Sequence, residues 1–375
     1  MAQEEERGWS SLPTDLLALI LDRLPWSSHP SFAAACRHWR SVVTPFFPAW
    51  LTPLLLSAAD VGSTNLRFYS PFHHKNFEVS RTLAAPGAKF CCSTGRHLTL
   101  CRLSTILEAD LVTGHVQELP PIIFGWFHFV IYDDGADTMF GVHTIGRPPR
   151  TSVAVKDDDG EWGAWHYPAP FTDPELIQSC PNTNPVLHGG LLYVLFNDGK
   201  LAVYDRDKHQ AEDHGHFEFL DKPGSFGLEC DDAYLFESDE GEPMAVLAAG
   251  RHGTPAHVVK LDEKEMEWEE VESLDGRAVF TGTLTTLMRK TDVEWMQDKV
   301  FFPRLHDWPE TVHVDIVDRD GEVAFVPTTS TGADTTAAAK DGGNLWAYEL
   351  GSEESREFWE TEKLDYSIWV DFKTC

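Results

Sequence analysis

The sequence is short of basic residues. It has 30 Lys and Arg against 60 Asp and Glu, which gives a formal net charge of −30. A surface that binds nucleic acid needs clustered cations to neutralise the phosphates. This balance does not supply them, so we expect no nucleic-acid partner.

Long apolar runs and paired cysteine motifs are also missing. The best apolar stretch, residues 51–59, is shorter than the roughly 18–20 residues that a membrane span needs. Acidic residues within the first 25 positions fit neither a secretory signal nor a transit peptide. The seven cysteines are an odd number without a C-x-x-C pair, which favours a reduced compartment. We therefore expect no membrane association and a location in the nucleus, the cytoplasm or both.

The apolar content and the charge distribution of the sequence indicate two structural units. Apolar residues make up 42% of the 375 positions, which is enough for real cores. Residues 1–50 carry five acidic and four basic residues, a net charge of −1, so the remaining chain carries −29. The charge contrast predicts a small N-terminal unit followed by a large acidic one.

Helical periodicity is confined to the N-terminal unit. One helix face is predicted between Leu12 and Leu24, with Thr14 as its cap and Pro25 as its end. A second helix is predicted from Pro30 to Val43, with Phe32, Ala35, Cys36, Trp39, Val42 and Val43 on one face. A unit of about 40 residues cannot bury all of these side chains by itself. The surplus apolar surface favours a partner, although a helical hairpin packed on the rest of the chain is an alternative.

The residues of this unit resemble an F-box. The matching features are the Leu12-Pro13 opening, an Ile20-Leu21 pair one turn before Leu24-Pro25, and the tail Cys36-Arg37-His38-Trp39-Arg40. The resemblance implies binding to the Skp-type adaptor of a cullin–RING ubiquitin ligase. It assigns the adaptor surface to Leu12, Pro13, Leu16, Leu17, Ile20, Leu21, Leu24, Phe32 and Trp39.

The stretch His29-Pro30-Ser31-Phe32 departs from that family. Many members have an acidic or other polar residue followed by a leucine at this point. The departure bears on how strongly the unit holds the adaptor.

From Asn65 onward a strand–turn–strand unit recurs. Successive copies start 40, 45, 49, 57, 55 and 32 residues apart, close to the roughly 40–50 residues of a propeller blade. This spacing predicts an all-β propeller of six or seven blades, whose incomplete last blade is closed by strand material from elsewhere. The copies are Leu66–Leu83, Ile106–Leu119, Thr151–Tyr167, Lys200–Phe217, His257–Val271, Val312–Val326 and Asn344–Trp359.

A second resemblance covers nearly the whole chain. The segments that begin at Trp268, at Asp298 and at Ser367 are similar to a plant family in which an F-box precedes a KIB-type β-propeller. The implied fold is a small all-α F-box of about three helices followed by the propeller. We expect the F-box at 8–50, a linker at 51–64 and the propeller at 65–375.

Motifs that could carry chemistry are weak. Asp157-Asp158-Asp159-Gly160 contains part of a calcium loop, but position twelve from Asp157 is Pro168, so a hairpin turn is the better interpretation. His73-His74 and His214-Gly215-His216 lack zinc spacing. Cys91, Cys92 and Cys101 lie in predicted strands, where buried thiols are the better account. We therefore predict no catalytic residue, no metal site and no cofactor.

The negative charge is concentrated between Asp205 and Asp275. That stretch has 21 acidic and six basic residues, a net charge of −15. One interpretation is a solvated surface that keeps an aromatic-rich propeller soluble. The other is a surface that attracts a basic protein segment.

These observations favour a non-catalytic substrate receptor of an SCF-type ubiquitin ligase. The F-box would bind the Skp-type adaptor, and the propeller would bind a target protein that is basic if charge selects it. Two alternatives stay open. One is a non-degradative binding protein with a vestigial F-box, and the other is a propeller enzyme that acts on a sugar or small metabolite.

Overall fold

The structure is a computed structural model of the 375-residue chain. It describes residues 9–24, 32, 35–42, 52–56, 65–72, 75–80, 85, 88–94, 97–102, 104–111, 115–122, 127–133, 135–143, 150–166, 185–196, 198–208, 217–226, 232–248, 256–282, 284–303, 311–319, 322–328 and 368–372.

The described part of the N-terminal unit contains the helical segments η1 (Trp9–Ser11), α1 (Thr14–Arg23) and α3 (Arg37–Arg40). Helix α1 begins one residue earlier than predicted. Pro13 occupies the N-cap position with an extended ψ of 143°, and no side chain caps the helix. Thr14 is therefore the first helical residue rather than the cap. The helix ends at Arg23, and its C-cap residue Leu24 is extended because the following Pro25 disfavours helical backbone before it.

The predicted second helix is interrupted. Cys36 has φ −165° and ψ 171°, which is extended backbone and cannot continue a helix. Its sulfur accepts a hydrogen bond from the Trp39 backbone N–H at 3.5 Å, so Cys36 caps α3 instead of packing inside one long helix. The prediction of a continuous helix through Cys36 was wrong because periodicity does not register a side chain that caps the backbone.

The described strands form five sheets, four of them of three or four strands. The first sheet contains β24 (Ile368–Val370), β1 (Leu54–Leu56), β2 (Asn65–Ser70) and β3 (Lys75–Ser80), in that order. The second contains β4 (Lys89–Thr94), β5 (His97–Arg102), β6 (Thr105–Asp110) and β7 (Val116–Leu119). The third contains β8 (Phe129–Asp133), β9 (Thr138–His143) and β10 (Arg150–Val155). The fourth contains β11 (Val186–His188), β12 (Leu191–Leu195), β13 (Leu201–Asp205) and β14 (Glu218–Phe219).

The fifth sheet has nine strands in two parts. One part contains β15 (Asp232–Glu237), β16 (Pro243–Ala248), β17 (Ala256–Asp262) and β18 (Glu267–Glu270). The other contains β19 (Arg277–Phe280), β20 (Leu287–Lys290), β21 (Lys299–Pro303), β22 (Thr311–Arg319) and β23 (Glu322–Thr328). A single register pair, Ala256 with Phe325, joins the two parts.

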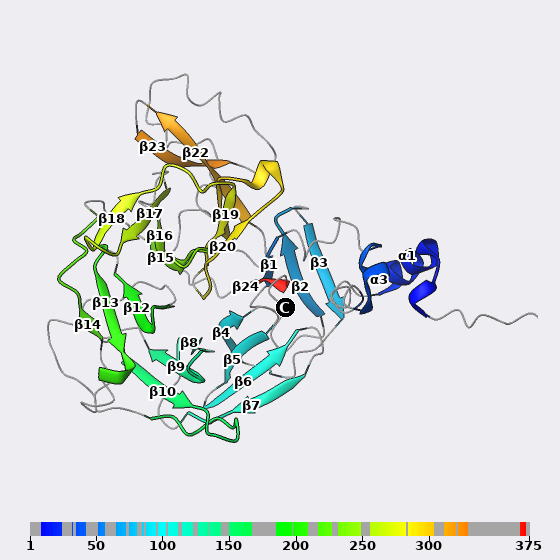
Figure 1. Cartoon of the computed structure of the whole chain (residues 1–375), viewed down its shortest axis with the longest axis horizontal. Helices are drawn as coiled ribbons and strands as arrows, with labels where there is room; N and C mark the ends of the chain where they lie inside the picture. The colour runs from blue at the N-terminus through cyan, green and yellow to red at the C-terminus, as the bar shows by residue number, and fades with distance from the viewer. Residues whose placement is uncertain are drawn as a thin grey trace, which may run out of the picture.

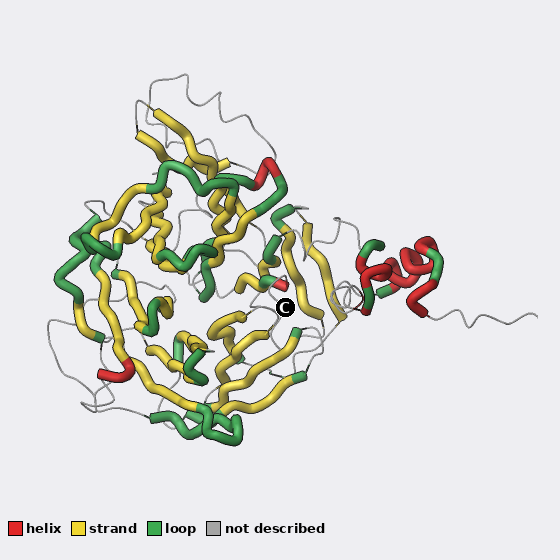
Figure 2. The backbone as a smooth tube through the Cα atoms, in the orientation of Figure 1, coloured by secondary structure: helices red, strands yellow, loops and turns green. Residues whose placement is uncertain are grey.

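The sheets are arranged around a common centre in chain order (Figure 1). Inner strand β4 contacts β24 on one side and β8 on the other, and β15 contacts β11 and β20. Strands dominate this part of the molecule, whereas helix is gathered in the N-terminal unit and in a few short turns elsewhere (Figure 2). The predicted combination of a small helical unit and a large all-β unit is confirmed.

The predicted hairpins are real where the structure describes them. Antiparallel pairs β2–β3, β6–β7, β17–β18 and β22–β23 match four predicted copies. Two others are partly formed: Val153 of β10 makes an isolated bridge to His166 and Lys156 makes one to Trp162, and β13 pairs with β14. The predicted copy at Asn344–Trp359 lies outside the described residues.

The first and the last described strands lie side by side in the first sheet. Strand β24 pairs antiparallel with β1, so that Leu54, Leu55 and Leu56 lie opposite Val370, Trp369 and Ile368. Within residues 51–64, which we expected to be a linker, Leu54–Leu56 form strand β1 and are fully buried. The predicted closure concerned the last blade, whose hairpin copy lies outside the described residues, whereas the strand contributed from the C-terminal part is found in the first sheet. That sheet is completed by the last described strand.

Trp369 anchors this junction. It is fully buried, its indole Nε1 donates to the Thr281 carbonyl at 2.7 Å, and its ring meets Phe280 edge-on at 5.1 Å. A Cβ on Gly282 would lie 2.8 Å from the Thr285 carbonyl oxygen, so glycine is required next to the indole. Leu55 joins the same cluster, so the first sheet packs on β19 through a dry aromatic contact.

None of the helices within the described residues is both long enough and apolar enough to cross a membrane.

Candidate protein-binding surfaces

The leucines of α1 are divided between core and surface. Leu17 is fully buried and forms a small core with Phe32 and Val42. The rings of Phe32 and Trp39 are 4.6 Å apart. Five further predicted adaptor residues are partly buried against this core: Leu12, Ile20, Leu21, Leu24 and Trp39. Most of the predicted adaptor surface is thus committed in part to holding the F-box helices together.

The side chains that remain open lie on another stripe of the same helix. Leu16 is 47% exposed and Leu19 is 51% exposed, and Pro13 is exposed at the helix start. Residues three apart on a helix lie on the same face, so Leu16 and Leu19 form one apolar patch. The sequence interpretation included Leu16 and Pro13 but missed Leu19. The signal was available, because Leu19 extends the helix face that Leu16 begins.

Two hydrogen bonds fix η1 against α3. The Trp39 indole Nε1 donates to the Trp9 carbonyl at 3.0 Å, and the His38 ring nitrogen Nε2 lies 2.7 Å from the Leu12 carbonyl oxygen. Trp9 itself is 75% exposed. These bonds hold the start of α1 in place, so the Leu16–Leu19 patch is presented on a positioned helix.

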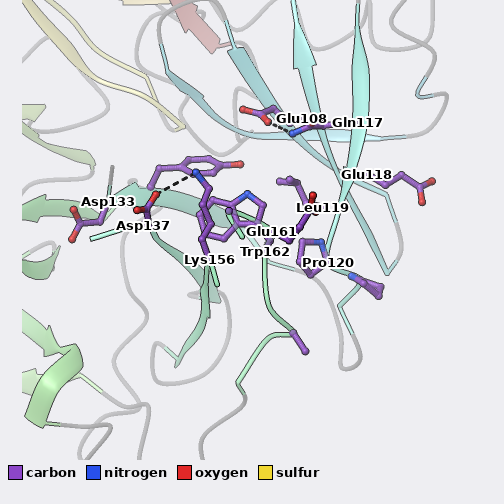
Figure 3. A pocket seen from close by; sticks show the side chains of 14 residues that line it. Glu108, Gln117, Glu118, Leu119, Pro120, Asp133, Asp137, Lys156, Glu161 and Trp162 are labelled. Atoms are coloured by element: carbon purple, nitrogen blue, oxygen red, sulfur yellow. Dashed lines mark hydrogen bonds and ion pairs between the residues drawn. The ribbon is translucent and has the colours of Figure 1, made fainter. Parts of the chain in front are cut away.

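A pocket of about 700 Å³ lies between the second and third sheets (Figure 3). Strands β6, β7 and β8 supply part of its wall, and the segment after β10, the two prolines after β7 and Asp137 before β9 supply the rest. Its lining residues combine aromatic rings, prolines and carboxylates. They are Glu108, Gln117, Glu118, Leu119, Pro120, Pro121, Tyr132, Asp133, Asp137, Lys156, Gly160, Glu161, Trp162 and Ala164.

The predicted turn at Asp157–Gly160 is confirmed and borders this pocket. The Asp157 carboxylate accepts backbone N–H bonds from Asp159 and Glu161, each at 3.0 Å. Gly160 has φ +80°, a conformation that glycine adopts without strain. These bonds account for the acidic run by turn geometry.

The acidic stretch Asp205–Asp275 is extensively ion-paired. Arg277 Nε lies 2.6 Å from an Asp239 oxygen and also pairs with Glu240, and Lys260 lies 2.8 Å from Glu242. His188 contacts both Glu237 and Glu263. Partial burial lowers the pKa of His188, but the hydrogen bonds and charges of the two carboxylates outweigh it and raise that pKa above its ordinary value. Part of the negative charge counted in the sequence is therefore engaged in ion pairs on the sheet surface.

The cysteines and histidines singled out in the sequence do not assemble into a site among the described residues. Cys91 and Cys101 are buried in one apolar cluster. A hydrogen bond with Cys101 and burial together raise the pKa of Cys91. The two histidine pairs at 73–74 and 214–216 lie outside the described residues. Within the described part, no group of three or more His, Cys, Asp or Glu is placed to hold a metal ion.

Comparison with known protein families matches both units. The KIB1-4 beta-propeller model matches residues 67–332, and the F-box domain model matches residues 9–46. The chain belongs to the KIB1-4 beta-propeller family and carries an F-box domain ahead of it. An F-box protein of Arabidopsis thaliana is 21% identical over 337 residues, which covers 86% of each chain. The family resemblance read from the sequence is confirmed.

Two solved structures with a distant likeness are bacterial. The periplasmic gluconolactonase PpgL of Pseudomonas aeruginosa is 13% identical with a TM-score of 0.41, and the match covers 74% of this chain and 83% of that one. A putative 6-phosphogluconolactonase of Bacteroides uniformis is 13% identical with a TM-score of 0.37 over the same shares.

Proposed function

We propose that this chain is the substrate-recognition subunit of an SCF-type ubiquitin ligase. The F-box binds a Skp-type adaptor, and the propeller binds a target protein. The chain forms and breaks no bonds itself. Its contribution is to hold a lysine-bearing target near the charged conjugating enzyme, which raises the effective concentration of the reacting groups.

The observation that carries this proposal is the exposed apolar patch of Leu16 and Leu19 on α1 of a matched F-box domain. Exposed leucines are common singly, but two on adjacent turns of one helix form a contiguous surface that water disfavours. Burying a leucine side chain stabilises a complex by about 1.5–3 kcal/mol. A partner that covers both therefore gains enough free energy to make the patch a strong contributor to binding.

The proposed propeller has six blades. The first four sheets supply one each, and the nine-stranded sheet supplies two, divided at the single pair between β17 and β23. Its domain begins at β1 rather than at residue 65, and β24 closes the first blade. We further propose that the protein acts in the nucleus, the cytoplasm or both, where a ligase of this kind meets intracellular targets.

The test replaces Leu16→Asp and Leu19→Asp together in the full chain. We expect loss of co-purification with the Skp-type adaptor, because two charges cannot be buried in an apolar interface without a partner. The far-UV circular dichroism spectrum and the urea midpoint should stay unchanged, because both side chains are about half exposed already.

The matched control makes the same chemical change on the sheets. Val155 is 39% exposed and Phe219 is 36% exposed, so Val155→Asp with Phe219→Asp places two charges at comparable sites. This control should retain the adaptor. Retained adaptor in the α1 variant would contradict the proposal. Adaptor binding without any cullin in the wild-type complex would instead favour the non-degradative alternative.

A further inference from the structure

The pocket between the second and third sheets has a rigid aromatic wall. The rings of Tyr132 and Trp162 meet edge-on with centroids 6.1 Å apart. Both are partly buried against the apolar cluster below the pocket. The Trp165 indole Nε1 donates to the Pro120 carbonyl at 2.9 Å, which fixes the proline side of the wall. Side chains that are already fixed before binding lose little conformational entropy when a ligand binds against them.

The rim of this pocket is strongly negative. Five acidic residues and one basic residue line it, a net charge of −4. Gln117 donates to the Glu108 carboxylate at 2.7 Å, and the Asp133 carboxylate accepts two backbone N–H bonds. The carboxylates of Glu118 and Glu161 have no ion pair or hydrogen bond within the described part of the chain. They differ in this from the ion-paired carboxylates of Asp239, Glu240 and Glu242, and their charge is available to a ligand.

Lys156 shows how a cation is held here. Its ammonium nitrogen lies 4.8 Å from the centre of the Trp162 ring and 3.3 Å from an Asp137 oxygen. Figure 3 shows Lys156 between these two residues. The face of an aromatic ring attracts a cation, and tryptophan does so best. The pocket therefore already binds one ammonium group by an aromatic face and a carboxylate, with further carboxylates still open.

We propose that this pocket binds an arginine or lysine side chain of an extended basic segment in the target protein. The incoming cation stacks against Trp162, in competition with Lys156, while Glu118 and Glu161 attract the charges that flank it. The identity of that segment as part of a ubiquitylation substrate rests on the function proposed above. The binding of a basic peptide does not rest on it. The proposal places recognition in the pocket between the second and third sheets rather than on the longer acidic stretch at Asp205–Asp275.

The experiment measures fluorescence anisotropy of a labelled Gly-Ser peptide with alternating arginines against the full chain. The same peptide with citrulline keeps the shape and removes the charge, and it should bind about tenfold more weakly. Trp162→Ala should weaken binding of the arginine peptide by a similar factor, and Trp162→Phe should retain part of the affinity. Glu118→Gln with Glu161→Gln should weaken binding and reduce its dependence on salt.

Lys156→Ala gives the opposite result. Removing the resident ammonium frees the Trp162 face and the Asp137 carboxylate, so the arginine peptide should bind about twofold to fivefold more tightly. A residue that merely supported the fold would not produce this gain. Weaker binding by Lys156→Ala would overturn the proposed competition.

The charge-matched control is Glu269→Gln with Glu272→Gln, which changes two exposed acidic residues within the stretch Asp205–Asp275. Its affinity should stay within about twofold of wild type. An equal loss in this control and in the Glu118–Glu161 variant would show nonspecific attraction and overturn the proposal. So would unchanged binding by Trp162→Ala, or equal binding of a peptide with proline in place of arginine. Adaptor co-purification from the same samples reports separately on the proposed function.

Discussion

The F-box unit and the sheets use apolar residues in different ways. The F-box buries only Leu17, Phe32 and Val42 among its described residues and leaves Leu16 and Leu19 about half exposed. The described sheets instead enclose large clusters of buried apolar side chains, with Trp369 completely buried. A unit of this small size cannot enclose its own apolar surface, whereas a set of packed sheets can. The described F-box residues therefore leave part of their apolar surface on the outside, whereas the sheets enclose theirs in several buried clusters.

The largest effect is expected where the sheets are joined. Trp369→Ala removes a fully buried indole and its hydrogen bond to Thr281, so the propeller should lose about 3–5 kcal/mol of its free energy of unfolding. Urea denaturation followed by circular dichroism measures the loss. Trp295→Ala is the matched control, because that ring is 37% exposed and should cost far less. Equal losses in the two variants would break the claim that the core of the sheets depends on this junction.

An intermediate effect is expected inside the F-box. Leu17→Ala should destabilise this unit by about 2–3 kcal/mol, because it empties part of a core with only three buried members. Leu16→Ala, its neighbour on the exposed stripe, should leave the fold intact and weaken only adaptor binding. Hydrogen–deuterium exchange of residues 14–24 separates the two results. Faster exchange in Leu16→Ala than in Leu17→Ala would reverse the division between core and contact residues.

The smallest effect concerns the charged surface of the sheets. The pKa of His188 is raised in the folded state, so its protonation favours folding. This stabilisation is fully present below the ordinary histidine pKa of about 6.5. It is lost as the pH rises through the higher folded value. We expect less than about 1 kcal/mol, because the carboxylates of Glu237 and Glu263 are largely exposed.

A pH series of urea midpoints for wild type and for Glu237→Gln with Glu263→Gln measures this difference. The wild type should lose stability relative to the variant as the pH rises from the acidic side through neutrality. A difference that does not change with pH would show that His188 contributes nothing through its charge.

Much of the organisation could be predicted from local patterns. The leucine spacing of residues 12–24 identified α1, and alternating apolar residues around Asp-Gly and Glu-Lys turns identified hairpins such as β17–β18. These features depend on neighbours within one helix turn or one hairpin, so the sequence carries them directly. The predicted helix boundaries differ from the structure at two positions. Cys36 caps α3, and Pro13 rather than Thr14 occupies the N-cap position of α1.

The candidate sites depend on contacts between residues that are far apart in the sequence. Leu16 and Leu17 are adjacent and chemically identical in sequence, yet one is about half exposed and the other has no exposure. The acidic stretch at Asp205–Asp275 looked the more promising surface. Several of its carboxylates are engaged by cations such as Arg277 and Lys260, whose positions in space a count of net charge does not give. The pocket at Trp162 was not visible at all, because its walls come from two sheets.

The sequence by itself determined the order of the units, the type of their elements and the family to which the chain belongs. It did so because amphipathic periodicity, turn residues and short motifs are local properties. The tertiary structure alone decided that Leu54–Leu56 pair with the last strand, which leucines of α1 stay open, and where a cation meets both an aromatic face and a carboxylate. Each of these depends on contacts between residues far apart in the chain. Burial and electrostatic energy are set by those contacts and not by composition.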